Sequence, residues 1–157
     1  MSTKQPDMSP GHQQKMTKQN KNLVHRYYRE AWNHGNMAVI SQIFTANHVL
    51  HQIPNFPTTL PPGSQGIRKL VTAIRAALPD LDLTIEDMVG QWNKVAIRFT
   101  LQGSHQGELL GSAPTGQQVT LSGMMIHYIT NEKITDTWFS HDIVNTLQKS
   151  EPALATV

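Results

Sequence analysis

The strongest constraint on the fold is an alternation of apolar and polar side chains in four segments of the second half of the chain. In the second segment, for example, Val95, Ile97 and Phe99 share one face while Arg98 and Thr100 share the other. A period of two residues is typical of a β-strand with one buried face. The four segments lie at residues 81–87, 95–105, 119–130 and 134–142. They predict an antiparallel meander.

The first half of the chain has mostly helical periodicity. Apolar residues recur at spacings of three and four in segments 20–36, 37–44 and 67–78, and a short strand is expected at 47–54. Helices followed by a meander indicate an α+β domain. We expect the three helices to pack on the concave face of a curved sheet.

The ends of the chain differ in composition from the domain between them. Residues 1–19 are polar and aperiodic, so a disordered arm is expected there, followed by one domain over 20–149 and a flexible tail over 150–157. The sequence has no apolar segment typical of a secretory signal or a membrane span, so we expect a cytoplasmic protein without a membrane partner. The formal charge is +2, without a basic stripe, so no nucleic-acid partner is expected. The absence of cysteine excludes disulfides and thiolate chemistry.

Four ionisable residues continue the apolar faces of the predicted strands. By alternation, His51, His105, His127 and Asp142 all point toward the core, with Trp138 on the same face as Asp142. Buried polar groups need partners, and a pocket with apolar walls would give them a purpose. Burial would raise the pKa of a carboxyl, which suits a general acid or base near neutral pH.

Structural explanations compete with these functional ones. Asp142 precedes an apolar segment, so it could simply cap a short helix. His127 could be a core histidine bonded to a carbonyl group. Three histidines and a carboxylate could hold zinc or iron, although no two of them have the spacing of a local ligand pair.

Four segments are specific enough for comparison with known families: NKNLVHRYYREAWNHGN, GIRKLVTAIRAALPDLDLTIEDMV, the loop GSHQGELLGSAPTG and EKITDTWFSHDIVNTLQ. With the sequence between Asn20 and Gln148, they resemble the SnoaL-like polyketide cyclases of the NTF2-like superfamily. The resemblance implies a conical α+β barrel. It also implies a cyclase that closes a ring by intramolecular aldol chemistry on a small, hydrophobic, carbonyl-containing, polyketide-like substrate, without a metal or organic cofactor, as a homodimer or homotetramer.

The same resemblance implies roles for individual residues. Asp142 matches the family's acid/base, and His127 matches the histidine that helps to polarise the substrate carbonyl. We expect the rest of the pocket to bind substrate through His51, His105, Trp138, Met125, Phe99, Tyr28 and Trp32. Leu50 stands where many relatives carry an acidic residue, which leaves the substrate preference open.

Other functions remain compatible with the same scaffold. A hydrolase, isomerase or hydroxylase would need a similar pocket. A non-catalytic protein that binds a small ligand, or an NTF2-like dimerisation module, would need no acid/base residue.

Overall fold

The structure is a computed structural model that describes residues 7–51 and 60–141. Its helices are α1 (Pro10–Tyr27), the π-helix η1 (Tyr28–Asn33), α2 (Ala38–Ile43) and α3 (Ser64–Ala77). Its strands are β1 (Phe44–His51), β2 (Asp82–Gln91), β3 (Lys94–Ser104), β4 (Gln118–Thr130) and β5 (Lys133–His141). The expected order of elements is therefore confirmed for the described residues, while the short helix expected after β5 lies outside them.

The strands form one five-stranded sheet in the order β1-β5-β4-β3-β2. Strands β2 to β5 make the predicted antiparallel meander, whereas β1 pairs with β5 in the parallel direction. A parallel pair is possible because β1 and β5 are joined by a long connection, which contains α3 and the other three strands. Only a short hairpin turn would require the two strands to be antiparallel. The predicted α+β class with a curved sheet is confirmed.

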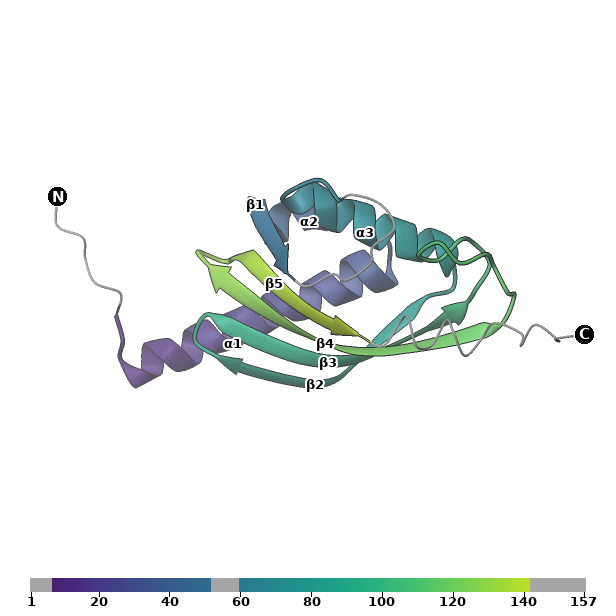
Figure 1. Cartoon of the computed structure of the whole chain (residues 1–157). Coiled ribbons are helices and arrows are strands. Elements are labelled where there is room, and N and C mark those ends of the chain that lie inside the picture. Colours follow the sequence, from purple (N-terminus) through teal and green to yellow (C-terminus); the bar gives the residue numbers. More distant parts are fainter. Residues whose placement is uncertain (1–6, 52–59, 142–157) are drawn as a thin grey trace, which may run out of the picture.

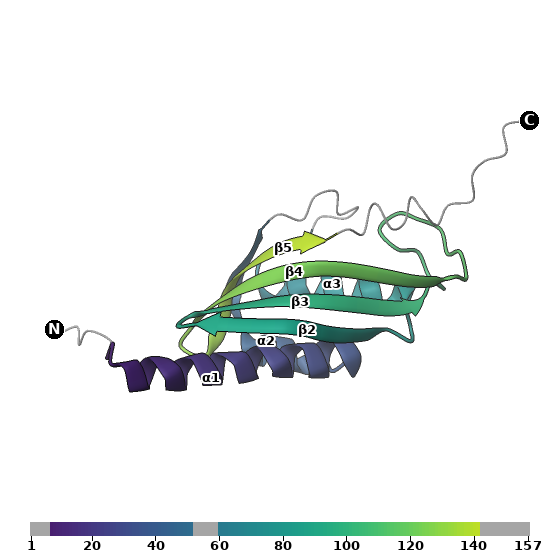
Figure 2. The same ribbon diagram turned by 90° about the horizontal axis from the view of Figure 1, so that it is seen from below.

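The sheet curves around the helices in a single layer. Figure 1 shows α2 and α3 above its concave face, with α1 running along the domain. In the view from below, β5 to β2 lie in front of α3, and no described helix covers their outer face (Figure 2). Apolar side chains of the inner face, such as Val95, Ile97 and Leu121, join the buried helix residues in one core.

The first helix begins earlier than the sequence analysis expected. Residues 10–19, expected to belong to a disordered arm, form the first turns of α1. Ser9 caps this helix by accepting a hydrogen bond from the His12 amide at 3.4 Å, and Pro10 occupies its first turn. Both residues are favoured at helix starts, so the sequence did contain the signal.

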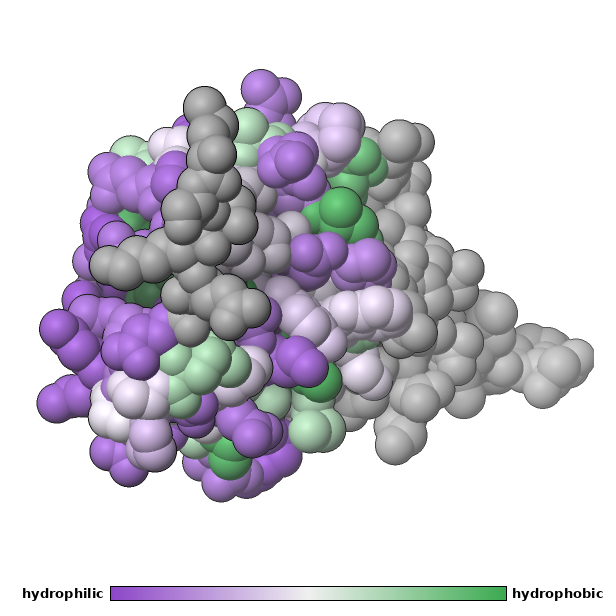
Figure 3. Space-filling view, turned by 90° about the vertical axis from the view of Figure 1, so that its left-hand side faces the viewer, coloured by the Kyte–Doolittle hydropathy of each residue, from purple (hydrophilic) through white to green (hydrophobic). Residues whose placement is uncertain are grey.

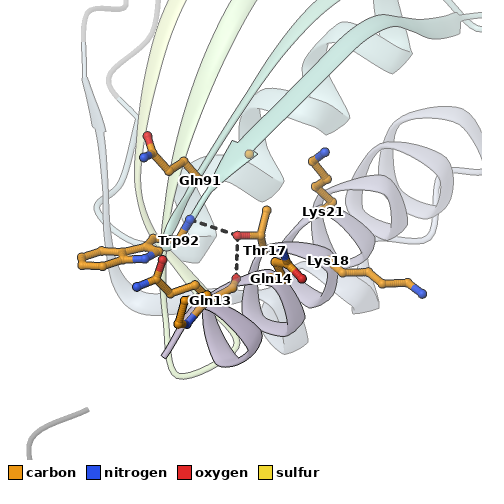
Figure 4. Close-up of a pocket in the computed structure, with 9 residues that line it drawn as sticks. Gln13, Gln14, Thr17, Lys18, Lys21, Gln91 and Trp92 are labelled. Carbon is orange, nitrogen blue, oxygen red and sulfur yellow. Dashed lines mark hydrogen bonds between the residues drawn. The ribbon is translucent and has the colours of Figure 1, made fainter. Parts of the chain in front are cut away.

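The beginning of α1 is attached to the turn between β2 and β3. The hydroxyl of Thr17 accepts a hydrogen bond from the Trp92 amide at 3.1 Å and donates one to the Gln13 carbonyl at 2.8 Å (Figure 4). Asn20 donates from Nδ2 to the Trp92 carbonyl at 2.9 Å. These bonds give this polar part of the helix a fixed position.

One end of the molecule is mostly hydrophilic. In Figure 3, hydrophobic residues on this face form small separate areas rather than one continuous patch. None of the described helices is both long and apolar enough to cross a membrane.

Gly63 allows β1 and the start of α3 to approach each other. Its φ is +76°, its amide donates to the His48 carbonyl at 3.1 Å, and a Cβ atom here would lie 1.7 Å from the Ala46 carbonyl oxygen. Gly116 has a similar φ of +70° but nothing within 4 Å of the corresponding position.

We therefore expect Gly63→Ala to destabilise the protein more than Gly116→Ala. The second change adds only backbone strain, about 1 kcal/mol. The first adds a backbone clash and should cost roughly 3 kcal/mol or more. Urea unfolding of the two variants measures the difference, and equal losses would show that the approach of α3 to β1 is not tight.

Candidate functional site

A chain of four buried polar side chains crosses the inside of the curved sheet. The Tyr28 hydroxyl lies 2.6 Å from His127 Nε2, and His127 Nδ1 lies 2.9 Å from Thr137 Oγ1. Thr137 Oγ1 is also 2.9 Å from His48 Nε2. At the other end, the Tyr28 hydroxyl donates to the sulfur of Met125 at 2.8 Å. We call Tyr28, His127, Thr137 and His48 the buried polar chain.

Each member comes from a different element. Tyr28 begins the π-helix η1, whose buried residues are Tyr28, Ala31 and Trp32. His127 of β4 and Thr137 of β5 are cross-strand partners, so their side chains project side by side. The β1–β5 register shifts between Phe44 and Val49, and His48 points inward there, packing edge-on against Phe44 with ring centroids 4.9 Å apart.

Burial keeps both histidines neutral. Desolvation lowers the pKa of His127 to about 3, with a smaller contribution from His48. Desolvation also lowers the pKa of His48 to about 4, and His51 lowers it further while Asp136 opposes the shift. Burial raises the pKa of Tyr28 well above its usual value. The four side chains of the buried polar chain therefore carry no net charge near neutral pH.

Three apolar residues expected to line a pocket belong to the same buried core as Tyr28. Met125, Phe99 and Trp32 are all buried, and Phe99 stacks on Phe139 with centroids 6.2 Å apart. Of the residues expected to bind substrate, Tyr28 is a member of the buried polar chain and Met125 is in direct contact with it.

His105 lies at the other end of the sheet. It is fully buried, and its Nδ1 is 3.3 Å from the Thr115 hydroxyl. It follows the end of β3, whereas His127 pairs with Val95 at the start of that strand. Val95 and Ser104 are nine residue steps apart along an extended strand, roughly 30 Å. His105 and His127 therefore do not share one cluster.

The expected inward orientation of His51 and Trp138 is wrong. The two rings stack on the outer face of the sheet, with centroids 4.2 Å apart, and Trp138 is 39% exposed. His51 Nε2 is also 3.0 Å from an Asp136 carboxylate oxygen, a bond that holds the pKa of Asp136 below its usual value. In this part of β5 the inward side chains are those of Thr137 and Phe139 instead.

Asp142 lies outside the described residues. Its expected inward orientation depended on sharing a face with an inward Trp138, and that premise is incorrect. Its role as acid/base therefore stays a prediction from the family resemblance.

Two members of the chain were missed by the sequence analysis. Strict alternation that points His51 and Trp138 inward leaves His48 and Thr137 on the opposite face, but both segments are irregular. The β4–β5 register shifts between Tyr128 and Ile129, so Ile134 and Thr137, three residues apart, both point inward. The sequence has two adjacent aromatic residues here, Trp138 and Phe139, and only one of them can point inward. Choosing Phe139 as the inward residue would have placed Thr137 inside as well.

The remaining features are peripheral to this cluster. Among residues 7–51 and 60–141, no group of three or more histidine, aspartate or glutamate residues could hold a metal ion. A groove of about 460 Å³ lies between α1 and the β2–β3 turn, lined by residues such as Lys18, Lys21 and Trp92 (Figure 4). A second hollow, of about 730 Å³, lies along α3. Neither is lined by a residue of the buried polar chain.

Comparison with known proteins identifies a family. The family model for the SnoaL-like polyketide cyclase matches residues 22–149. No curated protein sequence matches the chain.

Solved structures share the fold at low sequence identity. A candidate SnoaL-like polyketide cyclase from Jannaschia sp. CCS1 has a TM-score of 0.74 and 20% identity, over 93% of this chain and 99% of that one. IdmH, a candidate polyketide cyclase from Streptomyces antibioticus, has a TM-score of 0.71 and 24% identity, over 83% of this chain and 97% of that one. AclR, a candidate hydroxylase from Streptomyces galilaeus, has a TM-score of 0.70 and 24% identity, over 86% of this chain and 99% of that one.

The two buried histidines should make stability depend on pH. Both have a lower pKa in the folded protein than the ordinary 6.5, so below pH 6.5 the unfolded chain binds more protons than the folded one. The free energy of unfolding should then fall as the pH decreases from 6.5 to about 4, by about 1.4 kcal/mol per pH unit for each histidine.

Urea unfolding at a series of pH values measures this slope. Most carboxyl groups remain ionised over the upper part of this range, so their contribution is small there. His48→Gln should reduce the slope by about half. A stability that does not change between these pH values would contradict the neutral burial of both rings.

Proposed function

This chain belongs to the SnoaL-like polyketide cyclase family, and from that premise we propose that it is an acid/base enzyme that acts on a small hydrophobic carbonyl compound. The observation that carries the proposal is the Tyr28–His127 contact of 2.6 Å inside an apolar enclosure. A hydroxyl held by a neutral imidazole is a positioned donor for a substrate oxygen. In a site without water, such a donor stabilises developing negative charge strongly.

The proposed reaction is an intramolecular aldol closure. Asp142 removes a proton from a carbon between two carbonyl groups, and the negative charge moves to an enolate oxygen that accepts a hydrogen bond from Tyr28. The enolate carbon then bonds to a second carbonyl carbon of the same molecule, whose π electrons move to its oxygen. That oxygen takes the proton back from Asp142. No metal or organic cofactor is required, because a hydrogen between two carbonyl groups is already acidic.

In this proposal His127 acts through Tyr28 rather than on the substrate directly. Both of its ring nitrogens are already within hydrogen-bond distance of protein hydroxyls. The Tyr28 hydroxyl donates to the sulfur of Met125, which is a weak acceptor. In this proposal a substrate oxygen replaces that sulfur as the acceptor.

Turnover by two variants tests the proposal. Compounds with neighbouring carbonyl groups are first screened for thermal stabilisation of the protein, and hits are assayed for cyclised product by mass spectrometry and chromatography. Tyr28→Phe should lower kcat by about 10² to 10³. Asp142→Asn should lower it by about 10² to 10⁴ and affect stability little, because Asn caps a helix about as well as Asp.

The matched control is Tyr27→Phe. Tyr27 is the neighbouring buried tyrosine, with its ring 4.7 Å from that of Tyr28, and this variant should keep kcat within about threefold of the wild type. Compounds that stabilise the protein but give no cyclised product would favour a non-catalytic binding function. Undiminished turnover by Asp142→Asn would exclude the aldol mechanism.

We also propose that a second copy of the chain binds the outer face of the sheet. One cross-strand row there runs through Trp138, Ile126, Ala96 and Val89, and exposed Met124 lies beside it. Apolar side chains that extend over several strands are typical of an interface. The neighbouring Arg98–Asp87 ion pair, at 2.7 Å, presents both signs of charge and so suits contact with an identical surface.

Trp138→Glu should convert a dimer into a monomer. The matched control is Trp92→Glu, because Trp92 is 38% exposed, against 39% for Trp138, but lies at the β2–β3 turn. Sedimentation velocity measures the association state of each variant. A wild-type monomer at concentrations of tens of micromolar, or dissociation of the dimer by Trp92→Glu alone, would contradict this interface.

A further inference from the structure

The hydrogen atoms of the buried polar chain can be assigned by counting. The Tyr28 oxygen has two short contacts, 2.8 Å to the Met125 sulfur and 2.6 Å to His127 Nε2, and each must contain one hydrogen. Methionine has no hydrogen to donate, so the Tyr28 hydrogen lies on the sulfur side. The hydrogen in the other contact must then belong to His127 Nε2.

The assignment continues through Thr137 to His48. A neutral His127 that carries its hydrogen on Nε2 has a bare Nδ1, which must accept the hydrogen of Thr137. Thr137 has one hydrogen, so its oxygen must accept from His48 Nε2 at 2.9 Å. Every hydrogen bond in the chain then runs in the same direction, from His48 toward Tyr28.

The far end of the chain is compatible with this direction. His48 Nδ1 is buried, and the described residues provide it with no hydrogen-bond partner. In the opposite direction Nδ1 would carry a buried, unpaired N–H, which is rare in proteins because it is costly. In the assigned direction it has only an unused lone pair.

We propose that Thr137 and His48 are positioning residues that hold His127 in its Nε2–H tautomer, so that Tyr28 must direct its hydroxyl hydrogen away from the histidine and toward the substrate. Without this constraint, Tyr28 could donate to His127 Nε2 and would have no hydrogen left for a substrate oxygen. Aligned hydrogen bonds also polarise one another, which strengthens the terminal donor. The consequence for turnover rests on the proposed function, whereas the tautomer itself does not.

Nitrogen NMR of the uniformly ¹⁵N-labelled protein tests the tautomer without a substrate. Long-range ¹H–¹⁵N spectra distinguish a protonated ring nitrogen from a bare one, and His127→Gln identifies the signals of His127. We expect a protonated Nε2 and a bare Nδ1 in the wild type. A protonated Nδ1 would overturn the proposal, whatever the activity of the protein.

Two pairs of variants separate positioning from packing. His48→Leu removes the N–H that obliges the Thr137 oxygen to accept, so this oxygen is free to accept from His127 Nδ1 instead, and the ratio of the two tautomers should shift by up to roughly fivefold toward the Nδ1–H form. His48→Gln, which keeps an N–H donor, should reverse this shift. Thr137→Val leaves Nδ1 facing a methyl group, where an unpaired N–H would cost more than an unused lone pair, so this variant should keep the Nε2–H form, as should Thr137→Ser. An unchanged tautomer ratio in His48→Leu would overturn the positioning role.

Kinetics with a substrate found by the screen complete the test. His48→Leu should lower kcat in proportion to the fraction of His127 that leaves the Nε2–H form, by up to about fivefold, with KM within about twofold, and His48→Gln should recover most of the rate. A wild-type tautomer as assigned with no turnover of any compound would refute the proposed function alone. Turnover that is equal in His48→Leu and the wild type, although the tautomer ratio has shifted, would refute the positioning role alone.

Discussion

The burial of a neutral histidine inside a curved sheet is the constraint on which this structure depends. His127 is fully enclosed, and an unpaired ring nitrogen there would cost free energy, so both nitrogens need partners. Tyr28 and Thr137 supply them. The same hydroxyls reach His48 and Met125, so one requirement links η1, β1, β4 and β5. A polar connection of this kind is stabilising only when every member is in place.

The irregular parts of the fold are those that complete this connection. The π-helix η1 begins at Tyr28, and register shifts occur where β1 and β5 turn His48 and Thr137 inward. A regular helix and regular strands would place other side chains at these positions. π-Helices and bulges are frequent near functional sites because they redirect single side chains. Here they convert an apolar interior into one with a directed set of hydrogen bonds.

The two faces of the sheet have separate roles in the proposed enzyme. The concave face carries the core and the buried polar chain, and the convex face carries the stacked His51–Trp138 pair and a row of exposed apolar residues. Since β5 contributes to both faces, Thr137 and Trp138 lie next to each other in sequence but serve different surfaces. A shift of β5 by one residue would therefore turn Thr137 to the outer face and Trp138 to the interior.

The sequence by itself determined most of the elements, their order and the α+β class, because hydrophobic periodicity is a local property of the chain. The family came from the resemblance of its motifs and not from periodicity. It also placed Tyr28, Met125 and His127 in the interior. It did not determine the phases of β1 and β5, since a register shift depends on the neighbouring strand, and alternation alone assigned His51 and Trp138 to the inside. Only the tertiary structure decided that His48 and Thr137 join His127, because residues 89 and 10 positions apart meet through cross-strand pairing and not through sequence spacing.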